Sequence, residues 1–441
     1  MITSLSQLLA LMCHHGATRI YAKKLAPNDN SKNQLYLGGD FSALNIIPHG
    51  DIYSDSAEVA GAVRDRAKAA VDFYWVDEAG RHRAPNTGLI LYPKYPEVRM
   101  SGFLLGCPAA PGEIMRVRDE GRVLFLGMTL QGAVLGYAAA ANDPIVAEFN
   151  ASEWQTIGVF QELPLRLEAA SSPKSQLLNE LRRICQLEWI ASQKLALDGT
   201  KTPYSAPNGG GYTLEAELGI TPNGYAEPDF MGWEVKQYGV GDFIKFRPKS
   251  PVTLMTPEPT GGIYKTEGVV EFLRKFGYPD QNGMPDRFNF GGRYDCQTQH
   301  HHRTGLRMVL DGYDVTTGKI IDMAGGMALI DNRDEIAASW TFAGMMAHWN
   351  RKHAQAAYVP SLFRTPPAQY SYGRQVMLCE KTDFLRFLRA FAAGVIYYDP
   401  AVKIERASSA KPHVKRRSQF RVAHADLAKL YDHHEIVQLT T

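Results

Sequence analysis

The sequence predicts a protein of two domains, an all-β N-terminal domain followed by an α/β C-terminal domain. The length of 441 residues exceeds one folding unit, since a domain has roughly 150 residues. The first half is rich in short β-branched and aromatic segments separated by Gly, Pro, Asn and Asp. Helical spacing of apolar residues begins after Pro173. We therefore expect domains at residues 1–170 and 173–441.

The N-terminal domain is predicted to be a barrel or sandwich of short strands. Several short strands at modest spacing, with turn residues between them, are typical of both architectures. One helix is expected at residues 56–70, where Ala and Val recur among basic residues. The expected strands lie at residues 19–23, 34–37, 71–76, 88–92 and 122–126.

A helix start marks the domain boundary. Ser172 is suited to an N-cap and Pro173 to the first helical position, and Leu177, Leu181 and Ile184 then recur at helical spacing. Residues 1–170 contain 15 basic and 18 acidic residues, a balance of −3, which leaves +5 for the remainder. The C-terminal domain is the more basic of the two.

Composition excludes several classes of protein. A formal charge of +2 excludes a histone-like polycation and an acidic disordered chain, so any affinity for nucleic acid must be local. Five dispersed cysteines without a CxxC pair indicate neither a disulfide framework nor a zinc site, and they favour a reducing cytoplasm. The N-terminus lacks the basic region of a signal peptide. The uncharged stretch 123–142 contains several glycines, which favours buried strands over a membrane span.

Chemistry concentrates in residues 207–237. In a strand, alternate side chains face opposite sides, so Trp233 and Val235 would face a core while Glu234 and Lys236 face a cleft. Asp229 has the wrong parity for one continuous strand, but a turn or bulge at Gly232 would bring it to the same side.

That convergence suits Mg²⁺-dependent phosphodiester cleavage. Mg²⁺ is bound by a few carboxylate oxygens and keeps several waters, so Asp229 and Glu234 are candidate ligands. Lys236 would orient or help deprotonate the attacking water and offset transition-state charge. Glu215, in an expected short helix after a glycine loop, would add a carboxylate through water or a second metal. A strand with a solvated face and an incidental Glu-x-Lys is the alternative for the bare triplet. The glycines 209–211 are followed by no Gly-Lys-Ser/Thr, which disfavours a nucleotide-binding loop.

These residues resemble a known family of nucleases. Residues 210–215 (GGYTLE) and 228–236 (PDFMGWEVK) are similar to the motifs of the MvaI/BcnI family of restriction endonucleases, a branch of the PD-(D/E)xK nucleases, and the similarity extends over about residues 173–441. The resemblance implies an α/β PD-(D/E)xK core with Asp229, Glu234 and Lys236 as catalytic residues and Glu215 on the preceding helix. It further implies one or two Mg²⁺ ions, and a monomer that nicks the strands of a short pseudosymmetric GC-rich site one at a time.

Two C-terminal segments are expected to contact DNA. Residues 403–421 contain seven basic residues against one acid, which is typical of a solvated face or a phosphate clamp. The resemblance implies instead a hairpin that enters a groove, where His413 and Arg421 reach base edges. Phosphate contacts are expected for the remaining basic residues. A loop-rich segment from 276 to 303 is the second candidate, with an ordinary polar surface loop as its alternative. The expected DNA-binding residues here are His301, Arg303, Lys411, His413, Lys415, Arg416, Arg417 and Arg421.

The N-terminal domain resembles the B3-like effector domain of EcoRII-type restriction enzymes over roughly residues 1–165. Residues 20–37 are similar to its first strand and DNA-binding loop, and residues 84–92 to the strand after its second arm. The resemblance implies a B3-like pseudobarrel. The second arm, residues 77–83, is short and carries two acids, so a plain β-hairpin is the alternative there. The expected contacts are Lys23, Lys24, Asn28, Asn30, Lys32, Asn33, Gln34, Arg81, Arg83, Lys94 and Arg99.

Together these features predict a type IIE-like restriction endonuclease that cuts both strands of double-stranded DNA. The N-terminal domain would hold a second copy of the target, for which CCWGG is the expected sequence. A monomer without membrane contact, accompanied by a cognate DNA methyltransferase, is expected. Two alternatives remain open at this point: a methylation-sensing or repair nuclease, and a non-catalytic DNA-binding regulator.

Overall fold

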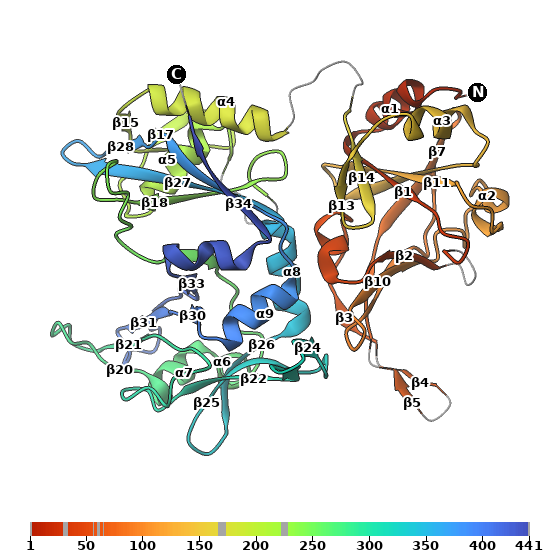
Figure 1. Cartoon of the computed structure of the whole chain (residues 1–441). Helices are drawn as coiled ribbons and strands as arrows, with labels where there is room; N and C mark the ends of the chain where they lie inside the picture. The colour runs from red at the N-terminus through yellow and green to blue at the C-terminus, as the bar shows by residue number, and fades with distance from the viewer. Residues whose placement is uncertain are drawn as a thin grey trace. The chain divides into compact units, whose positions relative to one another are not determined.

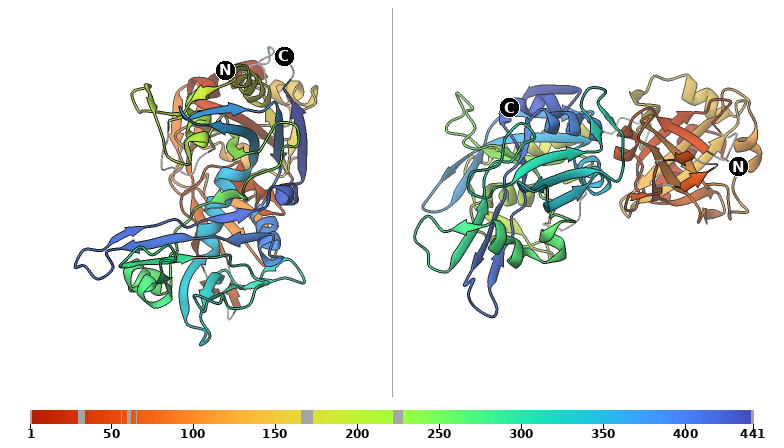
Figure 2. Two further views of the ribbon diagram at one scale, coloured as in Figure 1. Left: turned by 90° about the vertical axis from the view of Figure 1, so that its left-hand side faces the viewer. Right: turned by 90° about the horizontal axis from the view of Figure 1, so that it is seen from below.

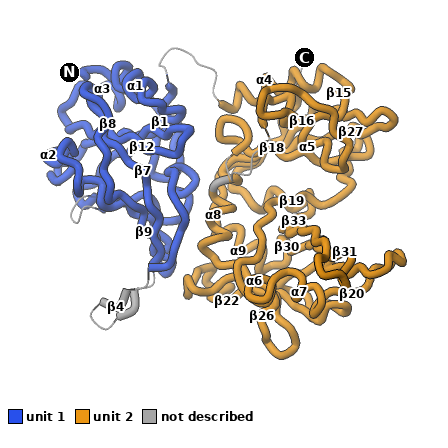
Figure 3. The backbone as a smooth tube through the Cα atoms, turned by 180° about the vertical axis from the view of Figure 1, so that it is seen from behind, with its two compact units in different colours: residues 1–172 blue, residues 173–441 orange. Residues whose placement is uncertain are grey.

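A computed structural model describes residues 2–29, 34–55, 57–59, 62–64, 66–165, 173–221 and 228–439. The chain divides into two compact units, unit 1 (Met1–Ser172) and unit 2 (Pro173–Thr441), coloured separately in Figure 3. No helix in the described ranges is long and apolar enough to cross a membrane.

Unit 1 consists mainly of two β-sheets (Figure 1). The larger sheet has the order β13 (Gln155–Ile157), β14 (Phe160–Leu163), β1 (Ala17–Lys24), β11 (Val123–Thr129), β12 (Ala133–Ala139), β7 (Asp72–Asp77) and β8 (Gly80–Arg83). The smaller sheet has the order β2 (Gln34–Gly38), β10 (Glu97–Ser101), β9 (Gly88–Tyr92), β6 (Ala67–Ala70) and β3 (Tyr53–Ser54). A hairpin pairs β4 (Ala57–Val59) with β5 (Ala62–Arg64). The helices are α1 (Leu5–His14), η1 (Phe41–Asn45), α2 (Gly112–Arg116) and α3 (Pro144–Asn150).

The mainly β character of unit 1 agrees with the sequence, but no closed barrel is found among its described residues. A buried apolar cluster joins α1 and α3 to the larger sheet, with Leu8, Phe125 and Phe149 inaccessible to solvent. The five predicted strands coincide with β1, β2, β7, β9 and β11. A B3-like pseudobarrel is therefore not confirmed.

The helix predicted at residues 56–70 is wrong, because this segment forms β4, β5 and β6; residues 56, 60, 61 and 65 lie outside the described ranges. Strand β6 pairs antiparallel with β9, so that Ala67 lies opposite Leu91 and Ala69 opposite Leu89. Ala67 and Ala69 are buried while Ala70 is exposed. Burial on one face of a sheet thus overrides the helix propensity of alanine.

Unit 2 contains a six-stranded sheet with helices against it. The sheet has the order β15 (Ile190–Ala191), β28 (Gln369–Tyr372), β27 (Gln355–Arg364), β29 (Gln375–Glu380) and β34 (His433–Gln438), and β18 (Glu234–Gly239) pairs parallel with β27. The helices are α4 (Pro173–Gln186), α5 (Gly209–Glu217), α6 (Ile263–Thr266), α7 (Val269–Phe276), α8 (Phe342–His353), α9 (Phe384–Ala392) and η2 (His424–Leu430). Helix α4 begins at the predicted Pro173.

Smaller sheets complete unit 2. One has the order β19 (Val252–Met255), β33 (Phe420–Val422) and β30 (Ile396–Tyr398). A second has the order β20 (Tyr278–Pro279), β21 (Arg287–Gly291), β31 (Ala401–Glu405) and β32 (His413–Lys415). A third has the order β22 (Arg307–Asp311), β25 (Gly326–Ile330) and β26 (Ile336–Thr341). Two hairpins pair β16 (Gln193–Leu195) with β17 (Lys201–Pro203), and β23 (Tyr313–Asp314) with β24 (Lys319–Ile320). The β31–β32 hairpin extends outward from its sheet in both views of Figure 2.

One face of the six-stranded sheet forms the core that supports strand β18. Leu177 and Leu181 of α4 and Leu214 of α5 pack with Trp233 and Val235 in one buried cluster. Because side chains alternate along a strand, Glu234 and Lys236 project to the opposite face.

Candidate active site and nucleic-acid interface

A tight turn places Asp229 next to strand β18. Phe230 and Trp233 exchange two backbone hydrogen bonds, 2.9 and 2.8 Å long, across Met231 and Gly232. Both turn residues have positive φ, 46° and 88°, as a two-residue turn of this hand requires. The backbone N–H of Val235 donates to Asp229 Oδ2 at 2.9 Å. The turn at Gly232 that the sequence predicted is therefore present, and it fixes the Asp229 carboxylate at the start of the strand.

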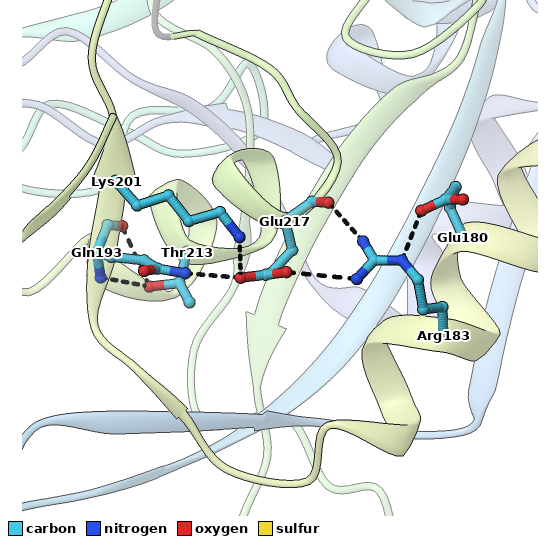
Figure 4. A network of polar contacts seen from close by, with 6 residues as sticks. All are labelled: Glu180, Arg183, Gln193, Lys201, Thr213 and Glu217. Carbon is cyan, nitrogen blue, oxygen red and sulfur yellow. Dashed lines mark hydrogen bonds and ion pairs between the residues drawn. The ribbon is translucent and has the colours of Figure 1, made fainter. Parts of the chain in front are cut away.

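Helix α5 supplies Glu215 and is tied to its neighbours through Glu217 (Figure 4). The Glu217 carboxylate accepts from Lys201 Nζ at 2.5 Å and from Gln193 Nε2 at 2.7 Å. Arg183 of α4 donates to the Glu217 backbone carbonyl at 2.7 Å. Residues two apart on a helix point to roughly opposite sides. Glu217 therefore holds the outer side of α5 while Glu215 lines the pocket described below.

The three glycines at positions 209–211 form the first turn of α5, so the expected glycine loop before the helix is not present. A Cβ atom at Gly209 would lie 2.6 Å from Ser192 Oγ, and one at Gly210 would lie 2.9 Å from Gln237 Oε1. Tyr372 Oη donates to the Gly210 carbonyl at 2.7 Å. Close packing of the helix start against β18 and β28 accounts for the first two glycines.

The carboxylates of Glu215 and Asp229 are half-buried and lie close to other negative charge. Burial, followed by repulsion from Asp229, raises the pKa of Glu215 to about 7. Burial, followed by repulsion from Glu234, raises the pKa of Asp229 to about 6. Both groups therefore titrate near neutral pH, which is the range in which an acid or base works best in catalysis.

Glu234 is held ionised by two lysines. Burial opposes its charge, but Lys236 and Lys352 keep its pKa below the usual range. Lys236 Nζ donates to Glu234 Oε1, and Lys352 Nζ lies 3.7 Å from the same oxygen. Burial likewise opposes the charge of Lys236, but Glu234 and Asp229 raise its pKa. The Lys236 ammonium therefore stays protonated and acts as a hydrogen-bond donor.

A buried polar network lies beside Glu234. His353 is fully buried, and its Nε2 lies 3.1 Å from the Leu254 carbonyl, which can only accept, so the proton is on Nε2. Its Nδ1 is 3.3 Å from Tyr431 Oη, which is 3.0 Å from Tyr358 Oη. Burial lowers the pKa of His353 to about 3, so the ring is neutral. The network satisfies these polar groups without adding charge next to Glu234.

A pocket of about 1060 Å³ opens at this site. Glu215 and Lys236 line it together with basic residues from distant segments, among them Arg417 and Arg421. Lys249, Lys352 and Gln419 are among the polar lining residues that sequence reasoning missed. Lys249 follows β18 closely, and its backbone N–H donates to the Gly239 carbonyl at 2.9 Å. Nothing in the spacing of Lys352 or Gln419 relates them to β18, so local sequence carries no signal for them.

Two carboxylates are placed to bind a cation. No group of three or more His, Cys, Asp or Glu suited to a metal ion is present within the described ranges. Mg²⁺, however, is commonly held by one or two carboxylates with waters and substrate phosphate. Glu234 Oε2 is buried and has no hydrogen-bond partner among the described residues, although buried polar atoms are rarely left unpaired. Asp229 and Glu234 therefore fit a magnesium ion.

The basic C-terminal residues fall into two places. His413 and Lys415 lie on β32, where both contact Glu405, at 3.4 and 3.6 Å. A hydrogen bond from Lys403, with further contributions from His413, lowers the pKa of Glu405 to about 2. Lys411, Arg416 and Arg417 are exposed. These residues present positive charge along the hairpin and toward the pocket.

Arg421 is not part of the hairpin, which corrects the expectation from sequence. It lies on β33, and its guanidinium donates to Asp399 at 2.6 Å and to the Pro251 carbonyl at 2.7 Å while lining the pocket. His301 is half-buried, with its ring 5.2 Å from that of Tyr294. Arg303 is exposed and lies over the Tyr278 ring.

In unit 1, Lys23 is not available to DNA, which corrects its assignment as a contact. It is 4% exposed, and Nζ lies 2.5 Å from Asp29 Oδ2. Asp29 also accepts from the backbone N–H groups of Ala26 and Tyr36, at 2.9 and 3.2 Å. The pair therefore shapes the turn after β1 from inside. Asn30, Lys32 and Asn33 lie outside the described residues.

The other predicted contacts of unit 1 lie at its surface. Lys24, Asn28, Arg81, Arg83 and Lys94 are exposed, and Gln34 and Arg99 are half-buried. Arg99 donates to Gln34 at 3.2 Å and pairs with Glu97 at 3.0 Å. Arg83 pairs with Asp72 at 3.4 Å. The short β7–β8 hairpin is closed by Asp77, which accepts from the backbone of Ala79 and Gly80.

Comparisons with known proteins point to one family. The model of the MvaI/BcnI restriction endonuclease family matches residues 178–431. A solved complex of restriction endonuclease MvaI with cognate DNA has 16% identity and a TM-score of 0.46, covering 62% of this chain and 100% of that chain. MvaI in the absence of DNA has 15% identity and a TM-score of 0.33 over the same shares. No curated protein matches the sequence.

Proposed function

The chain belongs to the MvaI/BcnI restriction endonuclease family and is a type II site-specific deoxyribonuclease, and on this premise we propose that unit 2 makes Mg²⁺-dependent cuts in double-stranded DNA at the pocket lined by Glu215 and Lys236. The observation that carries the proposal is the cluster of Asp229, Glu234 and Lys236 around the buried Glu234 carboxylate within the matched residues. Family membership sets aside the non-catalytic regulator.

Asp229 and Glu234 would hold Mg²⁺, which supplies Lewis-acid activation of the scissile phosphate when bound. The protonated ammonium of Lys236 would donate to a phosphate oxygen or to the attacking water and offset developing negative charge. Glu215, whose pKa of about 7 allows exchange of a proton near neutral pH, would accept the proton of that water. Each group would thus have a separate role in one in-line displacement.

The outward-facing basic residues would hold the duplex. Lys415, Arg416 and Arg417 would contact phosphates, while His413 on the β31–β32 hairpin would reach base edges. Arg421, held by Asp399 in the pocket wall, would contact the strand that is cut.

Unit 1 would bind a second copy of the target through a B3-like surface, making the enzyme type IIE-like. Its exposed residues Lys24, Arg81, Arg83 and Lys94 support this assignment, since they present cations at the surface. We further propose a monomer that nicks the two strands in sequence at CCWGG in the cytoplasm, alongside a cognate methyltransferase.

Digestion of plasmids with one or two candidate sites tests the proposal. With Mg²⁺, discrete fragments with defined ends are expected, a nicked intermediate should precede linear product, and the two-site plasmid should be cut faster. Asp229→Ala should abolish cleavage, whereas EDTA should do so reversibly. Cleavage confined to methylated or damaged DNA would instead support a modification-sensing or repair nuclease, and equal rates on both plasmids would remove the effector role of unit 1.

A further inference from the structure

Helix α8 brings a second lysine to the catalytic strand. Lys352 Nζ lies 3.7 Å from Glu234 Oε1, the oxygen that already accepts from Lys236. It also acts electrostatically on Glu215 and Asp229, so it shares one site with all three carboxylates. Lys352 lies outside the sequence motif at residues 228–236.

The position of Lys352 is set by rigid surroundings. The side chain of Thr341 caps the start of α8, and Met345, Trp349 and His353 are buried residues on the inner side of this helix. Two residues beyond the helix begins β27, in which Ala356 pairs with Glu234 of the catalytic strand. The helix end therefore cannot shift without moving strand pairing at the catalytic residues themselves.

The side chain of Lys352 faces the pocket. His348 and Lys352, four residues apart and so on one side of the helix, both line it. The Lys352 side chain is 26% exposed, whereas that of Glu234 is 1% exposed. A separation of 3.7 Å is too long for a hydrogen bond, and no hydrogen bond of the Lys352 ammonium is found among the described residues. The three N–H donors of Lys352 are therefore available to a pocket ligand, whereas one N–H of Lys236 already donates to Glu234.

We propose that Lys352 binds the scissile phosphate as a second cation beside the catalytic motif. The inference rests on the proposed function and names one contact of the bound strand. A phosphate that enters the pocket meets this ammonium in addition to that of Lys236, because both lysines line the pocket and approach the same Glu234 oxygen. Since an ammonium is a point charge on a flexible stem, a small rotation exchanges the long ion pair with Glu234 for a hydrogen bond to the phosphate.

The test removes each side of the contact in turn. After the cut position has been mapped on plasmid DNA, an oligonucleotide duplex is made with a neutral methylphosphonate at that position and compared with ordinary DNA. Binding is measured by fluorescence anisotropy in EDTA, so that it does not depend on cleavage. Lys352→Met keeps the length of the stem and removes the charge, and Lys352→Arg keeps the charge.

Lys352→Met is expected to weaken binding of ordinary DNA about tenfold, the usual loss for a charge-assisted hydrogen bond, and to leave binding of methylphosphonate DNA unchanged. The dependence of log affinity on log salt should become shallower by about one unit. Lys352→Arg should retain most of the affinity. Lys319→Ala, an exposed lysine on β24 away from the pocket, should show no dependence on the methylphosphonate.

An equal loss on both duplexes would overturn the inference, since it would mean that Lys352 only balances the charge of Glu234. Thermal melting of Lys352→Met shows whether this variant has a folding defect. If it has one, the binding of Lys352→Arg to the ordinary and the methylphosphonate duplex is compared instead. Wild-type cleavage with Mg²⁺ is measured separately. An enzyme that cuts normally but shows no coupling refutes the role of Lys352 alone, whereas an enzyme that does not cut refutes the proposed function.

Discussion

The two units carry their charges in different ways. In unit 2, Glu234 is buried and Glu215 and Asp229 are half-buried beside it, and burial and repulsion between these carboxylates raise the pKa of Glu215 and of Asp229. In unit 1, the predicted DNA contacts are mostly exposed and have acids beside them, such as Asp72 beside Arg83. Burying like charges costs stability, so it persists where function requires it. Exposed ion pairs cost little, so their presence says much less about function.

The largest expected effect comes from the carboxylate cluster of unit 2. Asp229→Asn keeps the shape and the acceptor for Val235 N–H but removes the charge. We expect a loss of at least about 1000-fold in cleavage rate, comparable to losing a main electrostatic contributor to catalysis. Plasmid cleavage under single-turnover conditions measures it. Binding of DNA in EDTA should be retained. A rate within tenfold of the wild type would show that Asp229 is not a catalytic carboxylate.

The buried pair of unit 1 should affect stability and not DNA contact. Lys23→Ala leaves the Asp29 carboxylate buried without its cation, which is expected to cost about 3 kcal/mol of unfolding free energy. Urea denaturation compares this variant with Lys24→Ala, its exposed neighbour, for which a change near zero is expected. If Lys24→Ala were the more destabilised, the structural role assigned to Lys23 would be wrong.

Glu215 should make stability depend on pH. Its pKa of about 7 in the folded protein exceeds the ordinary value, so the folded state retains a proton that the unfolded state has lost. Stability is therefore lost as pH rises from about 4.5 to 7. Metal-free Glu215→Gln, which cannot ionise, should be more stable than wild type by roughly 2 kcal/mol at pH 8 and equally stable at pH 4. Thermal melting at the two values measures it, and a constant difference would contradict the assignment.

The smallest effect is expected at the exposed hairpin of unit 1. Replacing Arg81 and Arg83 with Ala should reduce stimulation by a second site roughly fivefold, equivalent to about 1 kcal/mol, with one-site cleavage unchanged. The matched control is Arg118→Ala, exposed in the same unit outside both arms. Cleavage rates on one-site and two-site plasmids provide the measurement. Unaltered stimulation would assign the hairpin an ordinary surface role.

Several local features could be predicted because neighbouring residues determine them. Short β-branched and aromatic segments between turn residues located β1, β2, β7, β9 and β11, and proline at the start of α4 located the first helix of unit 2. The turn at Gly232 followed from parity, since Asp229 could reach the side of Glu234 only if the chain turned between them. The prediction failed at residues 56–70. Alanines there favour helices in isolation, but in the fold they lie on β6, which pairs with β9 in a sheet.

The sequence by itself determined which residues could do the chemistry, because Asp229, Glu234 and Lys236 are close in the chain and the geometry of a turn and a strand fixes their facing. Only the tertiary structure decided how they behave. Burial and mutual repulsion set the pKa values of Glu215 and Asp229, packing explains the first two glycines of α5, and strand pairing brings Lys352 to Glu234. Electrostatic strength depends on distance and solvent exclusion, and both are properties of the folded chain.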